Sequence, residues 1–124
     1  MKLRKGIYIK VYKGYFVARL VGVGADKRFD CAALNHPRTL AGDWQYLEKT
    51  ISKIILEFCG SIGKLIKPIL LVHLIPKFEG GYTTSEFAIF KQVGENAGAH
   101  FCFMCGNNYG PLEDKDIKDV FAGW

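Results

Sequence analysis

The chain has 124 residues, of which 49% are hydrophobic and 23% are charged. This length suits one globular domain and is too short for a multidomain enzyme. The composition also excludes collagen, coiled-coil and intrinsically disordered chains, because it has neither their biased residue usage nor a shortage of apolar side chains. We therefore expect residues 1–124 to form a single soluble domain.

The net charge of +5 arises from 17 basic and 12 acidic side chains, and the positive excess lies at the amino end. The basic residues that precede the first acidic residue, Asp26, are Lys2, Arg4, Lys5, Lys10, Lys13 and Arg19. Lysine at alternate strand positions usually protects an exposed sheet edge, so we favour a solvated edge over a nucleic-acid surface. The acidic carboxyl end contains Glu113, Asp114, Asp116 and Asp119. A head-to-tail contact between copies is therefore electrostatically feasible.

The amino end and the cysteines both indicate a cytoplasmic protein that does not bind membranes. Apolar residues near the start alternate with Lys10 and Lys13 and do not form the uninterrupted run of a signal peptide. No apolar run approaches the roughly 18 residues of a transmembrane helix. The cysteines are Cys31, Cys59, Cys102 and Cys105. They lie mostly in apolar runs, as reduced thiols do, and not in a loop-rich disulfide framework.

The first third of the sequence predicts three antiparallel strands. Apolar residues alternate with lysine and tyrosine over 7–12, and a run of aromatic and β-branched residues covers 15–21 after the Lys13-Gly14 turn. This pattern is typical of a β-hairpin. After a glycine-containing turn, a third extended segment is expected over 28–34.

The first predicted helix begins after Asp43, a good N-cap residue, and ends at Gly60. Between them, apolar residues recur with the helical period. The segment Pro68–Pro76 is continuously apolar between its prolines, which predicts a strand covered on both faces. We expect it to be the central strand of the sheet.

Two further helices and one strand are predicted in the last third. Thr83 and Glu86 have capping-box spacing and open a helix that runs to about Ala97. A short apolar strand follows over 101–104, and the last helix starts near Leu112. The order is therefore βββαβαβα, which predicts an α/β fold with one mixed sheet and helices packed on it through right-handed crossovers.

The segment His-Pro-Arg-Thr-Leu-Ala-Gly-Asp at 36–43 leads into the first predicted helix. It resembles the entry into the first helix of bacterial actin homologues of the MreB kind, the rod shape-determining family. The apolar strand Pro68–Pro76, then Thr84 and Glu86, then Ala-Gly-Ala at 97–99 resemble a later part. The element order is also that of the first subdomain of the actin, sugar-kinase and heat-shock ATPase superfamily. The resemblance covers about residues 35–104 and implies a ribonuclease H-like, actin-like subdomain.

The nucleotide site of that family is not retained in the sequence. The family's first hairpin carries an Asp-x-Gly turn that meets metal and phosphate, whereas the corresponding stretch at 10–14 is Lys-Val-Tyr-Lys-Gly. The second phosphate loop and the adenosine-binding glycines have no counterpart either. The resemblance thus implies a subdomain that has kept the scaffold and lost the nucleotide chemistry, with no cofactor and no metal.

Three residues are candidates for catalysis or metal binding, and for each we favour a structural role. Cys102 and Cys105 have the Cys-x-x-Cys spacing of half a zinc site, but no second paired motif supplies the other ligands. His73 interrupts a buried apolar strand and has no recognisable nucleophile or acid to act with. We expect core thiols and a neutral, hydrogen-bonded core histidine.

The hairpin provides the candidate binding residues Tyr8, Lys10, Tyr12, Lys13 and Tyr15. Tyrosines interleaved with lysines on an open sheet edge are typical of protein interfaces and of strand addition. We predict a non-enzymatic protein-interaction module, whose partner is a protein such as a bacterial actin homologue, or a second copy of the chain.

Two alternatives remain open. A small thiol- or nucleotide-dependent enzyme would use Cys102 and Cys105 or His73. A single-stranded nucleic-acid binder would stack bases on the tyrosines of the hairpin, although nucleic acid is the less favoured partner.

Overall fold

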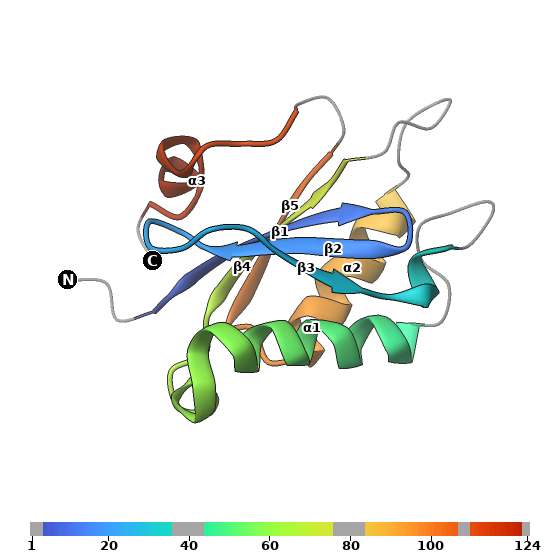
Figure 1. Cartoon of the computed structure of the whole chain (residues 1–124), viewed down its shortest axis with the longest axis horizontal. Coiled ribbons are helices and arrows are strands. Elements are labelled where there is room, and N and C mark those ends of the chain that lie inside the picture. The colour runs from blue at the N-terminus through green and yellow to red at the C-terminus, as the bar shows by residue number, and fades with distance from the viewer. Residues whose placement is uncertain (1–3, 36–43, 76–83, 107–109, 123–124) are drawn as a thin grey trace.

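A five-stranded mixed sheet organises the protein in the computed structural model, which describes residues 4–35, 44–75, 84–106 and 110–122 (Figure 1). The strands are β1 (Gly6–Tyr12), β2 (Tyr15–Leu20), β3 (Lys27–Asp30), β4 (Ile69–Leu74) and β5 (Phe101–Cys105). Their order in the sheet is β3-β2-β1-β4-β5. The first three strands are antiparallel, whereas β1, β4 and β5 run parallel to one another.

Helices cover both faces of this sheet. The helix α1 (Trp44–Cys59) lies between β3 and β4 in the chain, and α2 (Thr84–Asn96) connects β4 to β5. Both helices pack on one face, and α3 (Asp114–Val120) packs on the other (Figure 1). Two short 3₁₀ helices, η1 (Ala32–Asn35) and η2 (Gly60–Lys64), flank α1 in the sequence. The chain therefore forms three layers.

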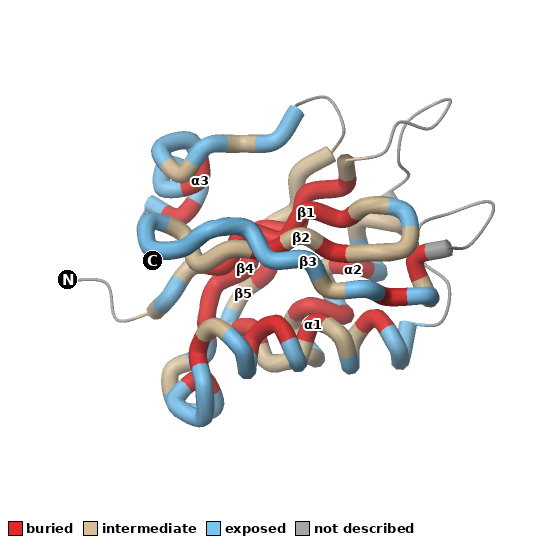
Figure 2. Tube along the Cα trace, viewed as in Figure 1, coloured by how far each residue is buried: buried red, intermediate tan, exposed pale blue. Residues whose placement is uncertain are grey.

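The alternation of β1 explains why it can serve as the middle strand. Its odd-numbered residues Ile7, Ile9 and Val11 are fully buried in the core beneath α1 and α2. Tyr8 points to the other face and is fully buried with Ile117 of α3. Because both faces of β1 are covered, its side chains are apolar or aromatic along most of its length (Figure 2).

The predicted α/β fold and its βββαβαβα order are confirmed. The first helix ends at Cys59, and Gly60 follows with a φ of 62°. The second ends at Asn96, and Gly98 has a φ of 125°. Both glycines adopt the left-handed conformation that commonly ends a helix. The predicted caps Asp43 and Thr83 lie outside the described residues.

Two expectations about the strands were wrong. The third strand ends at Asp30 instead of Leu34, because the chain turns back on the hairpin: Cys31 N–H donates to Gly14 O at 2.9 Å, and Gly14 N–H donates to Leu34 O at 3.3 Å. These bonds place Cys31 and Leu34 in the core from η1. The apolar strand β4 is an interior strand, but the middle position belongs to β1.

The placement of β4 can be tested with Leu71→Asp. Leu71 is 1% exposed and pairs with Tyr8 of β1 and Phe103 of β5. Because the substitution buries an unpaired carboxylate, we expect it to lower the free energy of unfolding by more than about 3 kcal/mol in urea titrations. The control is Leu65→Asp, since Leu65 is 85% exposed and its replacement should change stability by less than about 0.5 kcal/mol. Equal stability of the two variants would contradict the placement.

Candidate functional site

The tip of the β1–β2 hairpin carries a stack of two tyrosines and an arginine. Tyr12 and Tyr15 pair across the Lys13-Gly14 turn, and their rings stack with centroids 5.0 Å apart and planes inclined by 12°. The guanidinium carbon of Arg28 lies 3.9 Å from the centroid of the Tyr15 ring. The tyrosines are half-buried, whereas Lys13 and Arg28 are exposed. We call Tyr12, Lys13, Tyr15 and Arg28 the hairpin-tip cluster.

The stack limits what the tyrosines can bind. Because β2 lies between β1 and β3, the ring of Tyr15 is enclosed by Tyr12 on one side and Arg28 on the other. A nucleobase would need a free ring face to stack on, so Tyr15 is not available for that role unless the cluster rearranges. A protein segment can instead contact the ring edges and donors that remain exposed.

Two of the predicted binding residues are buried and belong to the interior. Tyr8 is fully buried under α3, and Lys10 is 8% exposed. The amino group of Lys10 donates to the carboxylate of Asp26 at 2.9 Å. Of the five candidate binding residues, Tyr12, Lys13 and Tyr15 are therefore accessible, whereas Tyr8 and Lys10 contact other parts of the same chain and cannot bind a partner directly.

Tyr8 is part of a buried chain of hydrogen bonds that joins β1, β4 and the segment entering α3. Gly106 O can only accept, so the Nε2–H of His73 donates to it at 3.0 Å. In neutral His73 the other nitrogen, Nδ1, then accepts from the hydroxyl of Tyr8 at 2.6 Å. The oxygen of Tyr8 in turn accepts from Leu112 N–H at 3.0 Å.

These hydrogen bonds support the prediction that His73 has a structural role in the core. Its side chain is fully buried, and both ring nitrogens have partners. Burial raises the pKa of Tyr8 to about 12, so its hydroxyl keeps its proton and remains a donor at neutral pH. Tyr8 and His73 therefore form a hydrogen-bonded polar network that lies with Tyr8 on the face of the sheet covered by α3.

The cysteines of the Cys-x-x-Cys motif point to opposite faces of β5. Cys102 is buried in the core beneath α1 and α2, whereas Cys105 packs with the cluster on the α3 face. They cannot share a metal ion or form a disulfide in this geometry. Burial raises the pKa of Cys102 to about 12 and raises that of Cys105 as well, so both favour the thiol. In the four described ranges, no group of three or more His, Cys, Asp or Glu could hold a metal ion.

Charged residues from the two ends of the sequence meet on the α3 face. Arg19 contacts Asp114 of α3 at 2.8 Å and Asp26 at 3.2 Å, and it donates to Leu112 O at 2.7 Å. Asp114 also accepts from Gly22 N–H at 2.7 Å. The basic amino end and the acidic carboxyl end, which could have joined two copies head to tail, are thus partly paired within one chain.

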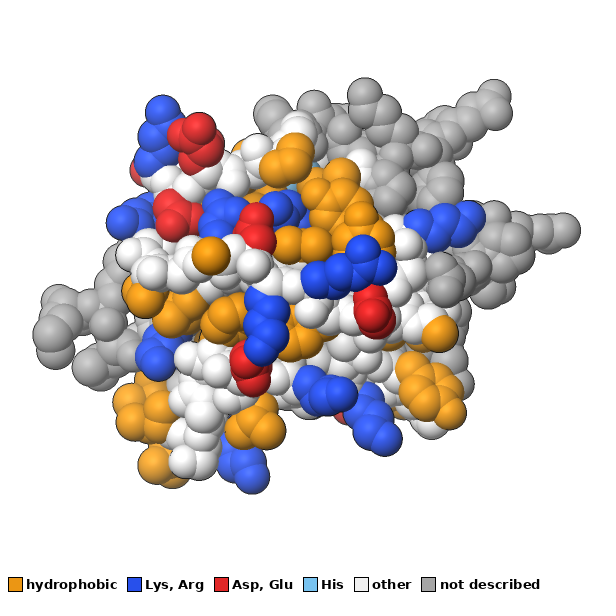
Figure 3. All heavy atoms as spheres, in the orientation of Figure 1, with side chains coloured by type: hydrophobic (Ala, Val, Ile, Leu, Met, Phe, Trp, Pro, Cys, Tyr) orange, Lys and Arg blue, Asp and Glu red, His pale blue; other side chains and the backbone are white. Residues whose placement is uncertain are grey.

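The strand β3 forms one edge of the sheet beside the hairpin-tip cluster. It pairs with β2 on one side and with no other strand in the part of the chain that is described. Lys27, Arg28 and Asp30 are exposed (Figure 2). Lys27 forms an ion pair with Glu57 of α1, and Arg28 forms one with Asp30. Lysine and arginine side chains are prominent over this side of the molecule (Figure 3).

Arg28 was not among the binding residues predicted from the sequence. Its contact with Tyr15 depends on the β2–β3 register, which pairs Arg28 with Val17 and brings its side chain diagonally to the tyrosine. The aromatic pair at the turn was a usable signal, because residues flanking a two-residue hairpin loop face each other.

Comparisons with known proteins assign no family to the chain. No protein family model matches it, and no curated protein matches it. None of the helices within the described residues is long and apolar enough to cross a membrane.

Removing the hydroxyl of Tyr8 tests the buried hydrogen-bond chain. Tyr8→Phe leaves His73 Nδ1 and Leu112 N–H without their partner, so we expect it to lower the unfolding free energy by about 1–3 kcal/mol. Amide exchange at Leu112 should also accelerate. The matched control, Tyr12→Phe at the half-buried hairpin tip, should change stability by less than about 0.5 kcal/mol. A loss of unfolding free energy no larger in Tyr8→Phe than in Tyr12→Phe would show that these buried hydrogen bonds contribute nothing to stability.

The ion pairs around Arg19 predict an acid-sensitive attachment of α3. The hydrogen bond from Arg19 holds the pKa of Asp114 below its usual value of 3.8. For Asp26, burial acts to raise the pKa, but hydrogen bonds from Lys10 and Arg19 outweigh it and the net shift is downward. Lowered pKa values in the folded state stabilise the fold above about pH 4, and this contribution is lost as the pH falls through the folded-state values.

We therefore expect Asp114→Asn to destabilise the fold at pH 7 and to do so progressively less as the pH falls below 4. The measurement is the unfolding free energy of both proteins in urea across this range. Asp119→Asn, on the same helix but in no ion pair with a described residue, serves as the control. A stability difference for Asp114→Asn that does not change with pH would refute the linkage.

Proposed function

We propose that the protein is a non-enzymatic interaction module that binds a protein partner through the hairpin-tip cluster and the adjoining edge of β3. The observation that carries this proposal is the continuity of the two features. Arg28, which stacks on Tyr15 beside Tyr12, belongs to β3. The outer edge of β3 pairs with no described strand.

The chemistry of both features suits a protein partner. Tyrosine and arginine are enriched at protein interfaces because each combines a large contact area with hydrogen-bonding groups. An unpaired strand edge can accept an extended segment through backbone hydrogen bonds. Arg28 and Lys27 already have carboxylate partners, whereas Lys13 forms no ion pair with a described residue. We expect the bound segment to present an acidic side chain to Lys13.

We also propose that the protein has no enzymatic role, because of the residues near the carboxyl ends of β1 and β4. In the resembled family this end of β1 carries the aspartate that meets metal and phosphate. Here the corresponding stretch, Lys10–Gly14, contains no carboxylate. Within it Lys10 pairs with Asp26, and its neighbour in β4 is the hydrogen-bonded His73. Neither side chain offers a carboxylate to a metal ion.

We further propose that the partner is a bacterial actin homologue of the MreB kind and that the module acts in the cytoplasm, in cell shape or the cytoskeleton. Support for this step comes from the segments that resemble that family and from the βββαβαβα order that the fold follows. Pairing of two copies through β3 is the second candidate, since an exposed edge strand can pair with its own copy.

The experiment measures binding to a purified MreB-type actin by calorimetry, with charge and aromatic variants of the module. We expect Tyr12→Ala and Lys13→Glu each to weaken binding roughly tenfold, as loss of an interface anchor does. Lys53→Glu provides the matched charge reversal, because Lys53 is an exposed residue of α1. Sedimentation of the module alone over a range of concentrations tests self-association.

Equal binding by Lys13→Glu and Lys53→Glu would overturn the assigned surface. If the module neither bound the actin nor associated with itself, both named partners would be wrong. Stoichiometric ATP hydrolysis by the purified module would overturn its non-enzymatic character.

A further inference from the structure

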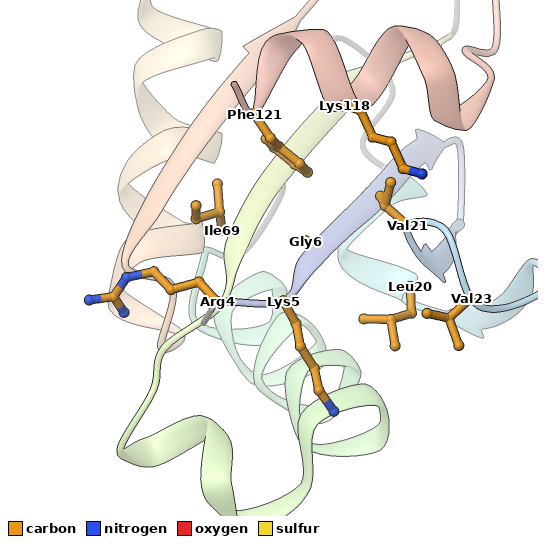
Figure 4. A pocket seen from close by; sticks show the side chains of 9 residues that line it. All are labelled: Arg4, Lys5, Gly6, Leu20, Val21, Val23, Ile69, Lys118 and Phe121. Atoms are coloured by element: carbon orange, nitrogen blue, oxygen red, sulfur yellow. The ribbon is translucent and has the colours of Figure 1, made fainter. Parts of the chain in front are cut away.

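A groove of about 420 Å³ lies at the end of the sheet opposite the hairpin tip (Figure 4). It opens between the start of β1, the turn that follows β2 and the last turn of α3. None of its lining residues belongs to the hairpin-tip cluster, so the groove is independent of the proposed protein-binding surface.

The floor of the groove is apolar and fixed by close packing. Ile69 and the ring of Phe121 are buried, at 2% and 5% exposure. A Cβ atom on Gly6 would stand 2.6 Å from the ring of Phe121, so the ring can lie over β1 only because this residue is glycine. Val21 and Val23 add apolar wall, and Val23 is 80% exposed at the rim. The hollow is thus built into the contact between α3 and the sheet.

The charged residues that line this apolar floor are all positive; Asp114, which accepts from Gly22 N–H at 2.7 Å and interacts electrostatically with Lys118, is not among the lining residues. Arg4, Lys5 and Lys118 line the groove, and no acidic residue does so among the described ones. Arg4 donates to Lys67 O at 3.0 Å and Lys5 to Phe58 O at 3.5 Å, and these acceptors are neutral carbonyls. None of the three cations forms an ion pair with a carboxylate of the described chain. Figure 4 shows the amino group of Lys118 beside Val21 and that of Lys5 on the other side of Gly6.

We propose that this groove binds a small amphiphilic carboxylate, a fatty acid of medium chain length. The acyl chain would lie on Ile69, Val21 and Phe121, and the carboxylate would lie between Lys5 and Lys118. The volume falls within the range of small-molecule sites, which combine a mostly apolar lining with a few polar groups that fix orientation. Cations that form no ion pair with a described carboxylate favour an anionic ligand, and the apolar floor favours one with a hydrocarbon tail.

The test is an amide NMR titration of the labelled protein with octanoate. We expect saturable shifts confined to residues around Gly6, Val21, Val23 and Phe121. Butyrate should bind much more weakly, by about threefold to fourfold for each buried methylene that it lacks. Octanol, which has the same chain length but no charge, should bind at least threefold more weakly than octanoate.

Two pairs of variants separate charge from packing. Val23→Asp places a carboxylate at the rim and should weaken octanoate binding about tenfold. Val23→Asn introduces a side chain of the same shape as aspartate but without charge, and should weaken binding by less than threefold. Lys118→Gln should weaken binding about threefold, and Lys115→Gln, an exposed lysine of the same helix that does not line the groove, should leave it unchanged. The spectra of the free variants report directly whether each is folded.

Equal affinity for octanol and octanoate, or equal effects of Val23→Asp and Val23→Asn, would overturn the preference for an anion. Shifts scattered over the surface would overturn the site itself. Binding to phosphatidylglycerol vesicles without any saturable shift by octanoate would replace the groove ligand with a membrane surface. These outcomes do not depend on the hairpin-tip cluster, so they leave the proposed function to its own test.

Discussion

The hydroxyl of Tyr8 holds together the face of the sheet that α3 covers. It joins β1 to His73 of β4 and to the backbone that enters α3, through one hydrogen bond to each. Arg19 strengthens the same attachment through Asp114 and Leu112. With α3 held in this way, Phe121 covers Gly6, and the groove at the start of β1 takes its shape.

The elements were predictable from the sequence because their signals are local. The helical period from Trp44 to Phe58, the apolar run before Pro76 and the glycines after two helices each specify a segment without reference to the rest of the chain. The burial of Tyr8 and Lys10 was not predictable, since alternating tyrosine and lysine are equally compatible with an exposed face. That burial results from long-range contacts with α3 and Asp26.

The two ends of the sheet have different surface chemistry. At the hairpin tip, aromatic rings and a guanidinium stack beside an unpaired strand edge, which suits a protein segment. At the opposite end, cations that form no ion pair with a described carboxylate surround an apolar hollow, which suits a small amphiphilic anion. The two features lie at opposite ends of the β1–β2 hairpin, so a ligand in the groove would contact α3 without touching the hairpin-tip cluster.

We propose that no nucleotide site exists at the carboxyl ends of β1 and β4, because Lys10–Gly14 contains no carboxylate and Lys10 and His73 bind other parts of the same chain. The most direct measurement is an amide NMR titration of the labelled protein with Mg-ATP. We expect no localised, saturable shifts at Lys10–Gly14 or at the carboxyl ends of β4 and β5. Saturating shifts at these positions would contradict it and would indicate a surviving nucleotide site.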